Sequence, residues 1–186
     1  MAEFLVTSEA DAAFLTGTLR NAIGQALETP EADIIRFAPD VERIALAATL
    51  GIPRGDGAIG TDITINGDTD GDGAPDVTLD ADGLQWHFVI NPGARLTLES
   101  MRLEGGRATG DGGENGLDGP GDFLITEKAA NGINGGAGFG ADGASIYNNG
   151  ILTLVRTEFD DNRALGGLGG AGGDGAKGTD GVPGAD

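Results

Sequence analysis

The stretch LTLESMRLEGGRATG (residues 96–110) returns later in the chain as LTLVRTEFDDNRALG (residues 152–166). A single shift aligns Leu96 with Leu152 and Leu103 with Phe159, and it holds over the whole stretch without a gap. Repetition at a fixed spacing is typical of solenoid proteins, in which each repeat packs on its neighbour. Each copy reads as a short strand, a one-residue bend, a second strand and a polar exit. The repeat therefore predicts successive faces of a coiled, parallel β structure.

Short apolar or alternating runs, each bounded by Gly, Pro, Asp or Asn, precede the repeat. They occupy residues 4–7, 34–37, 43–46, 63–65, 77–79 and 86–90. Many short strands separated by turns indicate an all-β fold, either a sandwich or a solenoid. A sandwich hairpin needs a reversing turn, and neither Asn-Gly nor Asp-Gly lies between Leu98 and Met101. The sequence therefore favours a parallel β-helix over residues 1–167.

One segment near the amino end has helical periodicity instead. Apolar residues recur at helical spacing between residues 11 and 28, which predicts an amphipathic helix over about residues 14–28. Thr16 or Thr18 is a candidate N-cap, and Pro30 ends the helix because the residue before proline avoids helical backbone angles. We expect this helix to cap the amino end of the solenoid.

Glycine is concentrated in the second half of the chain, with 11 of the 36 glycines in residues 1–103 and 25 in residues 104–186. Residues 105–143 are too many and too glycine-rich for one coil's turn, so we expect a loop extruded from the solenoid, with one extra strand at 123–126. Residues 168–186 form a glycine-rich tail that cannot bury enough apolar surface by itself to offset its ordering entropy. Three interpretations remain open: a flexible tail, the start of further coils, or a segment that folds on calcium or a partner.

The composition excludes several classes of protein. The chain has no cysteine and one histidine, so it has no disulfide framework and no Cys-ligated metal site, and a Ser-His triad is not expected. Its formal net charge of -19 repels nucleic acid and anionic lipid, and no apolar run is long enough for membrane insertion. The first residues lack the basic flank and apolar stretch of a signal peptide. A cytoplasmic location, a removed leader, or export by a route read elsewhere all remain open.

Several ordered segments together resemble the amino-terminal part of secreted bacterial right-handed parallel β-helix proteins, the adhesin-like proteins that often carry RTX calcium repeats. The segments are TLRNAI (18–23), ITINGD followed by DGDGAPDVT (63–78), and SIYNNGILTL followed by DDNRA (145–164). The resemblance covers roughly residues 3–167. It implies a right-handed β-helix with an amino-terminal capping helix, serving as a scaffold or attachment surface. Type I secretion of a longer parent would bring such a module to the cell surface or the medium.

The sharpest local motif is DTDGDG at residues 68–73, followed by two further aspartates. Oxygen ligands at the first, third and fifth positions with glycine at the sixth match the opening of a calcium loop. The candidate metal ligands are Asp68, Asp70, Asp72, Asp76 and Asp80. The bidentate Glu at the twelfth position is missing, and Leu79 stands there. Two interpretations stay open: bound calcium, or an acidic solvated turn between two coils.

Three weaker signals have ordinary structural explanations. Residues 169–177 fit an RTX nonapeptide except that Ala176 replaces a larger apolar residue, and one copy cannot form a calcium roll. Alternation around His87 predicts a surface histidine. Asp160, Asp161 and Arg163 resemble the cluster of a β-helix polysaccharide lyase or epimerase, but the repeat makes Arg163 a structural turn residue.

From these observations we expect a non-catalytic, calcium-associated structural or adhesion module of a secreted or cell-surface bacterial protein. Its partners would be a surface glycan, a protein, or further copies of itself. Two alternatives come from other classes. One is a self-assembling extracellular protein that stacks through its solenoid ends, where strand edges are unpaired. The other is a polysaccharide lyase or epimerase, which needs a base and a cation cluster on one face.

Overall fold

The structure is a computed structural model of the chain, and it describes residues 1–54, 61–117 and 134–173. The chain divides into two compact units. The first comprises Met1–Ala108 and Asp142–Ala164, and the second comprises Thr109–Ala141 and Leu165–Asp186. This division differs from the predicted one of residues 1–167 and 168–186, because residues 109–141 group with the residues that follow Ala164 and not with the solenoid. The strand predicted at 123–126 lies outside the described residues.

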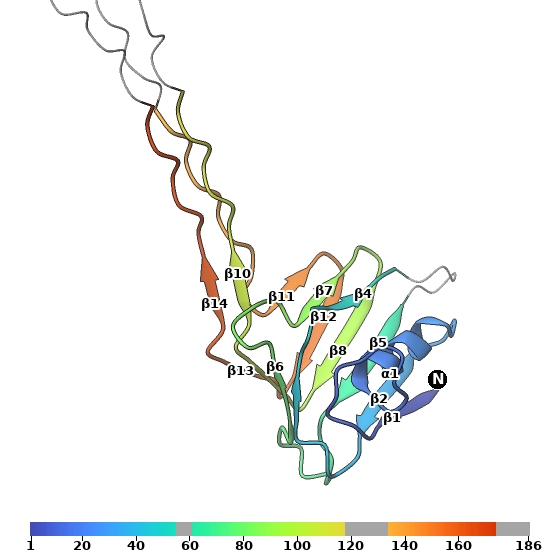
Figure 1. Cartoon of the computed structure of the whole chain (residues 1–186). Helices are drawn as coiled ribbons and strands as arrows, with labels where there is room; N and C mark the ends of the chain where they lie inside the picture. The colour runs from blue at the N-terminus through green and yellow to red at the C-terminus, as the bar shows by residue number, and fades with distance from the viewer. Residues whose placement is uncertain (55–60, 118–133, 174–186) are drawn as a thin grey trace, which may run out of the picture. The chain divides into compact units, whose positions relative to one another are not determined.

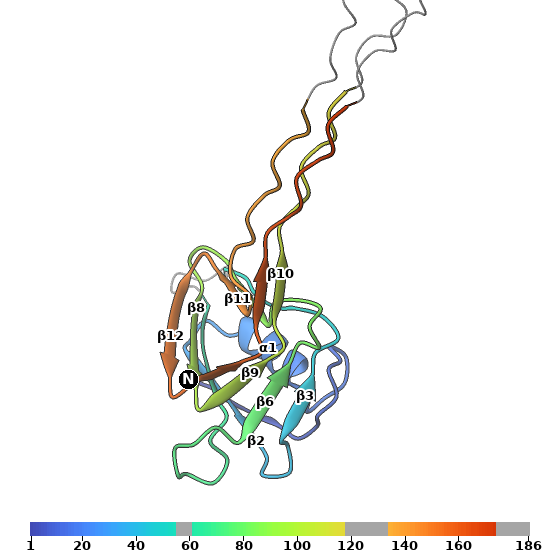
Figure 2. The same ribbon diagram turned by 90° about the vertical axis from the view of Figure 1, so that its left-hand side faces the viewer.

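The first unit is a stack of all-parallel sheets in a parallel β-solenoid-like arrangement (Figures 1 and 2). The first sheet contains β1 (Glu3–Val6), β2 (Asp33–Phe37), β5 (Asp62–Asn66), β8 (Arg95–Glu99) and β12 (Ile151–Val155), in that order. The second contains β3 (Arg43–Ala45), β6 (Val77–Asp80), β9 (Met101–Glu104) and β13 (Glu158–Asp160). The third contains β4 (Leu50–Ile52), β7 (Phe88–Ile90) and β11 (Ile146–Asn148). Two further strands, β10 (Arg107–Thr109) and β14 (Arg163–Leu165), pair with each other.

The register of the strands confirms the repeat. On the first sheet Leu152 lies opposite Leu96, and on the second sheet Phe159 lies opposite Leu103. Because the strands are parallel and in register, residues of one kind stack on adjacent coils. The prediction of a mostly β chain of stacked parallel strands is therefore confirmed.

Aliphatic side chains from successive coils form continuous buried columns. On the first sheet Ile35, Ile65 and Leu98 occupy equivalent positions on adjacent strands, and each is fully buried. Alternate residues of these strands point to the opposite, outer face because side-chain direction has a period of two along a strand. Burial of such columns supplies most of the apolar stabilisation, at about 25 cal/mol per Å² of apolar surface removed from water.

The predicted one-residue bend is a residue with left-handed backbone angles. Ser100 separates β8 from β9 with φ of 48°, and Arg156, its equivalent one coil later, has φ of 49°. Such angles are unusual for residues other than glycine. Their recurrence at equivalent positions indicates that the corner geometry is imposed by stacking of the coils and not by residue type.

The amino-terminal helix α1 covers Leu19–Leu27, so the predicted start near residue 14 is wrong. Gly17 has φ of 82°, which interrupts helical geometry, and the Thr18 hydroxyl then accepts the N–H of Asn21 at 3.2 Å as the N-cap. Phe14 and Leu15, expected on the apolar face, are exposed. Of the two N-caps considered from sequence, Thr18 is the one used.

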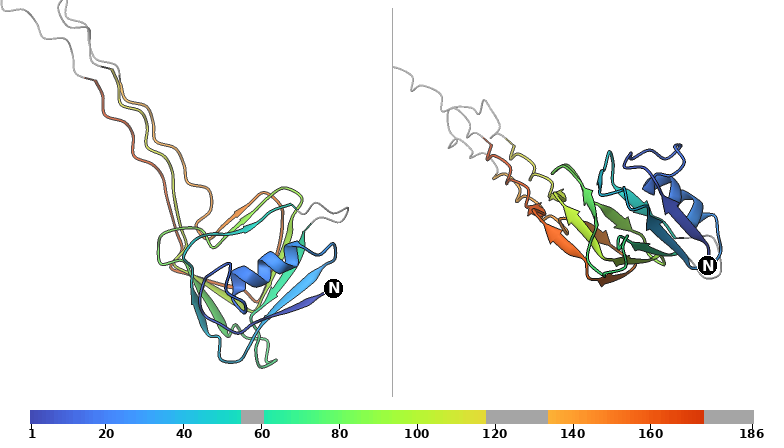
Figure 3. Two further views of the ribbon diagram at one scale, coloured as in Figure 1. Left: turned by 45° about the vertical axis from the view of Figure 1, so that its right-hand side comes forward. Right: turned by 90° about the horizontal axis from the view of Figure 1, so that it is seen from below.

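The helix covers one end of the solenoid core. Its buried residues form one face that packs against β1 and β2 (Figure 3). They are Leu19, Ala22, Ile23 and Ala26. The helix therefore keeps water from the apolar interior of the first coil, as the sequence predicted.

The described part of the second unit consists of three extended segments that run side by side (Figure 1). The N–H groups of the first segment (110–116) donate to carbonyl oxygens of the third (165–171). The third segment donates to the second (136–139), and the second donates back to the first. Each N···O distance in this ring is 2.7–2.8 Å, and the bonds recur at every third residue along each segment. The collagen triple helix also has a threefold glycine period. Here the 136–139 segment runs antiparallel to the other two, as the order of its hydrogen-bond partners shows.

Glycine at every third position permits this packing. Residues 110, 113 and 116 of the first segment are less exposed than their neighbours, and so are 138 in the second and 170 in the third, all of them glycine. A Cβ at Gly170 would lie far inside 3.0 Å of the Glu114 carbonyl oxygen, so a side chain cannot be accommodated there. The region expected to be an extruded loop and a tail is thus a second ordered unit where the structure describes it.

Candidate functional site

The loop between β5 and β6 brings three of the predicted metal ligands together. Asp68, Asp70 and Asp76 each offer a carboxylate oxygen, and these oxygens lie within 4.8 Å of one another. Oxygen donors at this separation suit a hard divalent cation such as calcium, which is bound through carboxylates and carbonyls at about 2.3–2.6 Å. The group could therefore hold a metal ion.

Backbone hydrogen bonds shape this loop locally. The Asp68 carboxylate accepts the N–H groups of Gly71 and Gly73, at 2.7 and 3.0 Å. Both glycines have positive φ, 87° and 85°, which allows the chain to curl around that carboxylate. The spacing DTDGDG thus folds into a tight acidic turn because short Asp side chains bond the backbone a few residues ahead.

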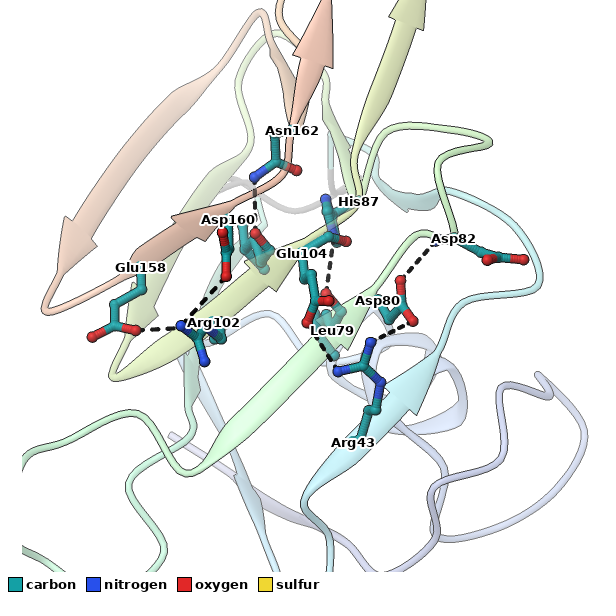
Figure 4. Close-up of polar contacts among 11 residues, drawn as sticks. Arg43, Leu79, Asp80, Asp82, His87, Arg102, Glu104, Glu158, Asp160 and Asn162 are labelled. Atoms are coloured by element: carbon teal, nitrogen blue, oxygen red, sulfur yellow. Dashed lines mark hydrogen bonds and ion pairs between the residues drawn. The ribbon is translucent and has the colours of Figure 1, made fainter.

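The other two predicted ligands lie outside the group of three. The Asp72 carboxylate accepts the N–H of Ala74 at 2.7 Å and does not join the cluster. Asp80 lies in β6, where it pairs with the Arg43 guanidinium at 2.7 Å and accepts the N–H of Asp82 at 2.8 Å (Figure 4). Asp80 is therefore committed to contacts on the outer face of the second sheet.

Hydrogen bonds from Thr69 favour the ionised form of the Asp76 carboxylate. The N–H and hydroxyl of Thr69 both donate to Asp76, at 2.7 and 2.8 Å, and these bonds lower the pKa of Asp76. Ionised carboxylates this close repel one another, and the repulsion is relieved by a bound cation. A cation bound among these carboxylates would therefore lower the electrostatic energy of the loop.

The same loop is anchored to two later coils. The carbonyl oxygen of Gly73 accepts the Ser100 hydroxyl at 2.9 Å and the Arg156 Nε–H at 2.8 Å. Ser100 and Arg156 are the equivalent left-handed corner residues of the two following coils. Through these bonds, the conformation of the acidic loop is linked to the stacking of three coils.

His87 is fully buried, so the prediction of a surface histidine is wrong. Its Nε2 lies 2.9 Å from the carbonyl oxygens of Leu79 and Glu104 (Figure 4). Its Nδ1 lies 3.0 Å from the Ser145 hydroxyl. Two carbonyl acceptors require Nε2 to carry the proton, so the Ser145 hydroxyl donates to Nδ1. The neutral ring therefore joins neighbouring coils by hydrogen bonds and is not placed as a catalytic base.

Burial lowers the pKa of His87 below its ordinary value of 6.5, despite the hydrogen bonds and nearby Asp80, which act in the opposite direction. The unfolded chain therefore binds more protons below about pH 6.5, so stability is lost as the pH falls through that value. The expected slope is at most about 1.4 kcal/mol per pH unit. Urea unfolding as a function of pH measures it. Because His87 is the chain's only histidine, a His87→Gln variant should lack this slope just below about pH 6.5, well above the ordinary carboxylate pKa of about 4. A slope that persists there in the variant would contradict the assignment, whereas a slope at lower pH is expected from carboxylates such as Asp76, whose pKa is lowered.

The residues considered for lyase or epimerase chemistry lie among ion pairs at the surface. Arg102 lies 3.6 Å from Glu158 and 3.5 Å from Asp160 (Figure 4). Arg163 reaches Asp161 only at 4.0 Å. All of these side chains are at least 45% exposed. Pairs in this setting contribute roughly 0–1 kcal/mol each. They fit a charged outer sheet face.

Sequence reasoning missed two contributors to the site. Ser100 and Arg156 lie far from the loop along the chain, and only their equivalence in the repeat marks them as corner residues.

The second unit also had a signal in the sequence. The glycine period of three, visible at residues 110, 113, 116 and 119, was that signal. It was hidden because further glycines interrupt the period.

The fold and the site together define a class: a parallel β-solenoid-like protein with a capping helix, an acidic loop that could hold a metal ion, and a glycine-rich three-segment unit. Comparison with family models, curated proteins and solved structures found no match to this chain. Among the described residues, the structure contains no helix long and apolar enough to cross a membrane.

Proposed function

We propose that the chain is a non-catalytic structural and adhesion module of a secreted or cell-surface bacterial protein, in which calcium in the Asp68–Asp76 loop fastens the coils of the solenoid. One observation carries the proposal: the loop that gathers three carboxylates is hydrogen-bonded, through Gly73, to corner residues of the next two coils. A cation that orders the loop would therefore stabilise the stack. The partner at the cell surface would be a glycan or a protein.

The ligand set supports an extracellular location. Three carboxylates without a bidentate Glu form a weak calcium site, and calcium modules that work outside cells have dissociation constants of about 10⁻⁴–10⁻³ M. Such a site fills only where calcium is abundant. The net charge of -19 is compatible with a soluble module that attracts cations and repels nucleic acid.

The fold we propose in full is a right-handed parallel β-helix. Parallel strands of one sheet are joined by right-handed crossovers in about 98% of cases, because the strand twist favours that hand. Every strand pair of the three main sheets is parallel, so each coil makes such a crossover. Right-handed solenoids of this kind present long regular faces that serve as scaffolds and attachment surfaces.

The test is thermal unfolding with millimolar calcium and with a chelator. Millimolar calcium is about ten times the dissociation constant of a site at the tighter end of this range, and it should stabilise the fold by about 1.4 kcal/mol, which raises the melting temperature by a few degrees. Asp70→Asn should abolish most of this increase because it removes one charged ligand. Asp72→Asn is the matched control: it lies in the same turn, and its side chain still accepts a backbone N–H, but Asp72 is outside the cluster.

The two variants separate the proposal from a general effect of charge. If calcium stabilises the wild-type chain and both variants equally, the ion screens the net charge and does not occupy this loop. If calcium stabilises none of them, the loop is an acidic turn and the calcium part of the proposal is wrong.

A further inference from the structure

The last coil of the solenoid leaves its apolar column open. Leu154 continues the column of Ile65 and Leu98, and Phe159 continues the column of Leu79 and Leu103. The earlier members are fully buried, whereas Leu154 and Phe159 are 44% and 48% exposed. At the opposite end, α1 covers the core. The described part of the first unit therefore has one capped and one open end.

The strand at the open end is also an unprotected edge. Within the described residues, β12 is the last strand of the first sheet, so one side of its backbone has no strand partner. Proteins usually protect such edges with charged residues. The strand at the other edge, β1, carries Glu3, which lies 3.7 Å from Arg36. By contrast, residues 143–155 include no charged side chain, although 22% of the chain is charged.

We propose that this open end binds the same end of a second copy of the chain, with β12 of one copy antiparallel to β12 of the other. Centred on Thr153, this pairing places Ile151 opposite Val155 and Leu152 opposite Leu154, with the two Thr153 residues facing each other. Cross-strand pairs of β-branched and aliphatic residues and of threonines stabilise sheets. The inference goes beyond the proposed function and does not depend on calcium.

Charge identifies a second copy as the occupant. A basic partner would find no carboxylate on residues 143–155, and most of the surface of a chain with net charge -19 repels its own copies. Residues 143–155 are the uncharged part of the last coil, and the carboxylates of Glu158 and Asp160 on its other strand, β13, lie near the Arg102 guanidinium. Two copies can therefore approach along β12 without that repulsion. The pairing also continues an existing interface, since each strand of this sheet already pairs with the strand of the next coil.

The geometry limits the assembly to a dimer. A two-fold interface uses the same surface on both copies and is closed by their association. The core at the other end of each copy is covered by α1. Stacking through this end therefore stops at two copies and does not propagate into a filament.

The experiment uses opposite charges at the centre of the pairing, with the full chain and a chelator present. Thr153 is exposed, so Thr153→Lys and Thr153→Glu should each leave the monomer folded. In either variant two like charges face each other, and self-association measured by sedimentation velocity should weaken roughly tenfold or more. An equimolar mixture of the two variants should restore the dimer. Thr97→Lys, at the equivalent position one strand earlier, is the control and should dimerise as the wild-type chain does.

Three results would overturn the proposal. The first is a wild-type chain that stays monomeric at every concentration, because the open end is then covered by something other than a second copy. The second is growth of species beyond the dimer, which indicates head-to-tail stacking. The third is failure of the mixture to restore the association lost in the single variants, since only a pairing centred on Thr153 predicts that recovery.

Discussion

Leu98→Ala is expected to lower the free energy of unfolding by about 2–5 kcal/mol, the usual range for deleting a fully buried leucine side chain. Leu98 lies in the middle of a buried column, with Ile65 before it and Leu154 after it. Its removal leaves a cavity that the flanking coils cannot close, because their backbones are fixed by the strand ladder. Such a loss is a large part of the stability of an ordinary domain.

The repeat provides a matched control at the equivalent position of the last coil. Leu154 has the same residue type, strand position and register but is 44% exposed, so Leu154→Ala should cost less than about 1 kcal/mol. Both variants are compared by urea unfolding at a concentration where the chain is monomeric. Equal losses would mean that the last coil is covered in solution, contrary to the exposure of Leu154 in the structure.

The pairing of the last two coils could be predicted because they share a repeat. The single shift that aligns the two copies correctly paired Leu96 with Leu152 and Leu103 with Phe159. The earlier coils do not repeat at that spacing. Ile35 pairs with Ile65, and Ile65 pairs with Leu98, so both of these coils are much shorter than the one that leads to Leu154. Loops of different length separate their strands, and no single shift of the sequence aligns them all.

Corners explain the errors at single residues. Alternation along residues 86–90 placed His87 on the outer face, but β7 begins at Phe88, and the histidine belongs to the turn before it. The period of two does not continue across a corner. In the same way, the helical spacing was followed from Phe14 across Gly17. The positive φ of Gly17 is incompatible with a helix, so α1 begins only after it.

The candidate metal loop was predictable only in its local part. Asp68, Asp70 and Asp76 come together through short-range turns that the spacing of aspartates and glycines specifies. Asp80 has the same residue type, but its position in β6 directs it to Arg43. Contacts across coils depend on register, which a single sequence does not supply.

The glycine-rich unit gives the second large effect. We expect Gly170→Ala to disrupt the three-segment unit, because its Cβ would collide with the Glu114 carbonyl oxygen. Alanine keeps the backbone N–H that Gly170 donates to Gly136, so the collision and not the loss of a donor is responsible. In the collagen triple helix, which has the same glycine period, a single replacement of an inward glycine disrupts the structure locally.

Gly169→Ala is the control, since a Cβ there would lie 3.6 Å from its nearest neighbour, an ordinary contact. Amide hydrogen exchange distinguishes the two variants. In Gly170→Ala the amides of Gly113, Gly116 and Gly136, which donate between segments, should exchange about tenfold faster or more. In Gly169→Ala they should exchange as in the wild-type chain, and amides of β5 and β8 should be unchanged in both.

If the intersegment amides of the wild-type chain show no protection, the three segments do not form this unit in solution. If these amides are protected and keep their protection in Gly170→Ala, the close approach of the three backbones does not require glycine at this position. The glycine period would then reflect composition alone.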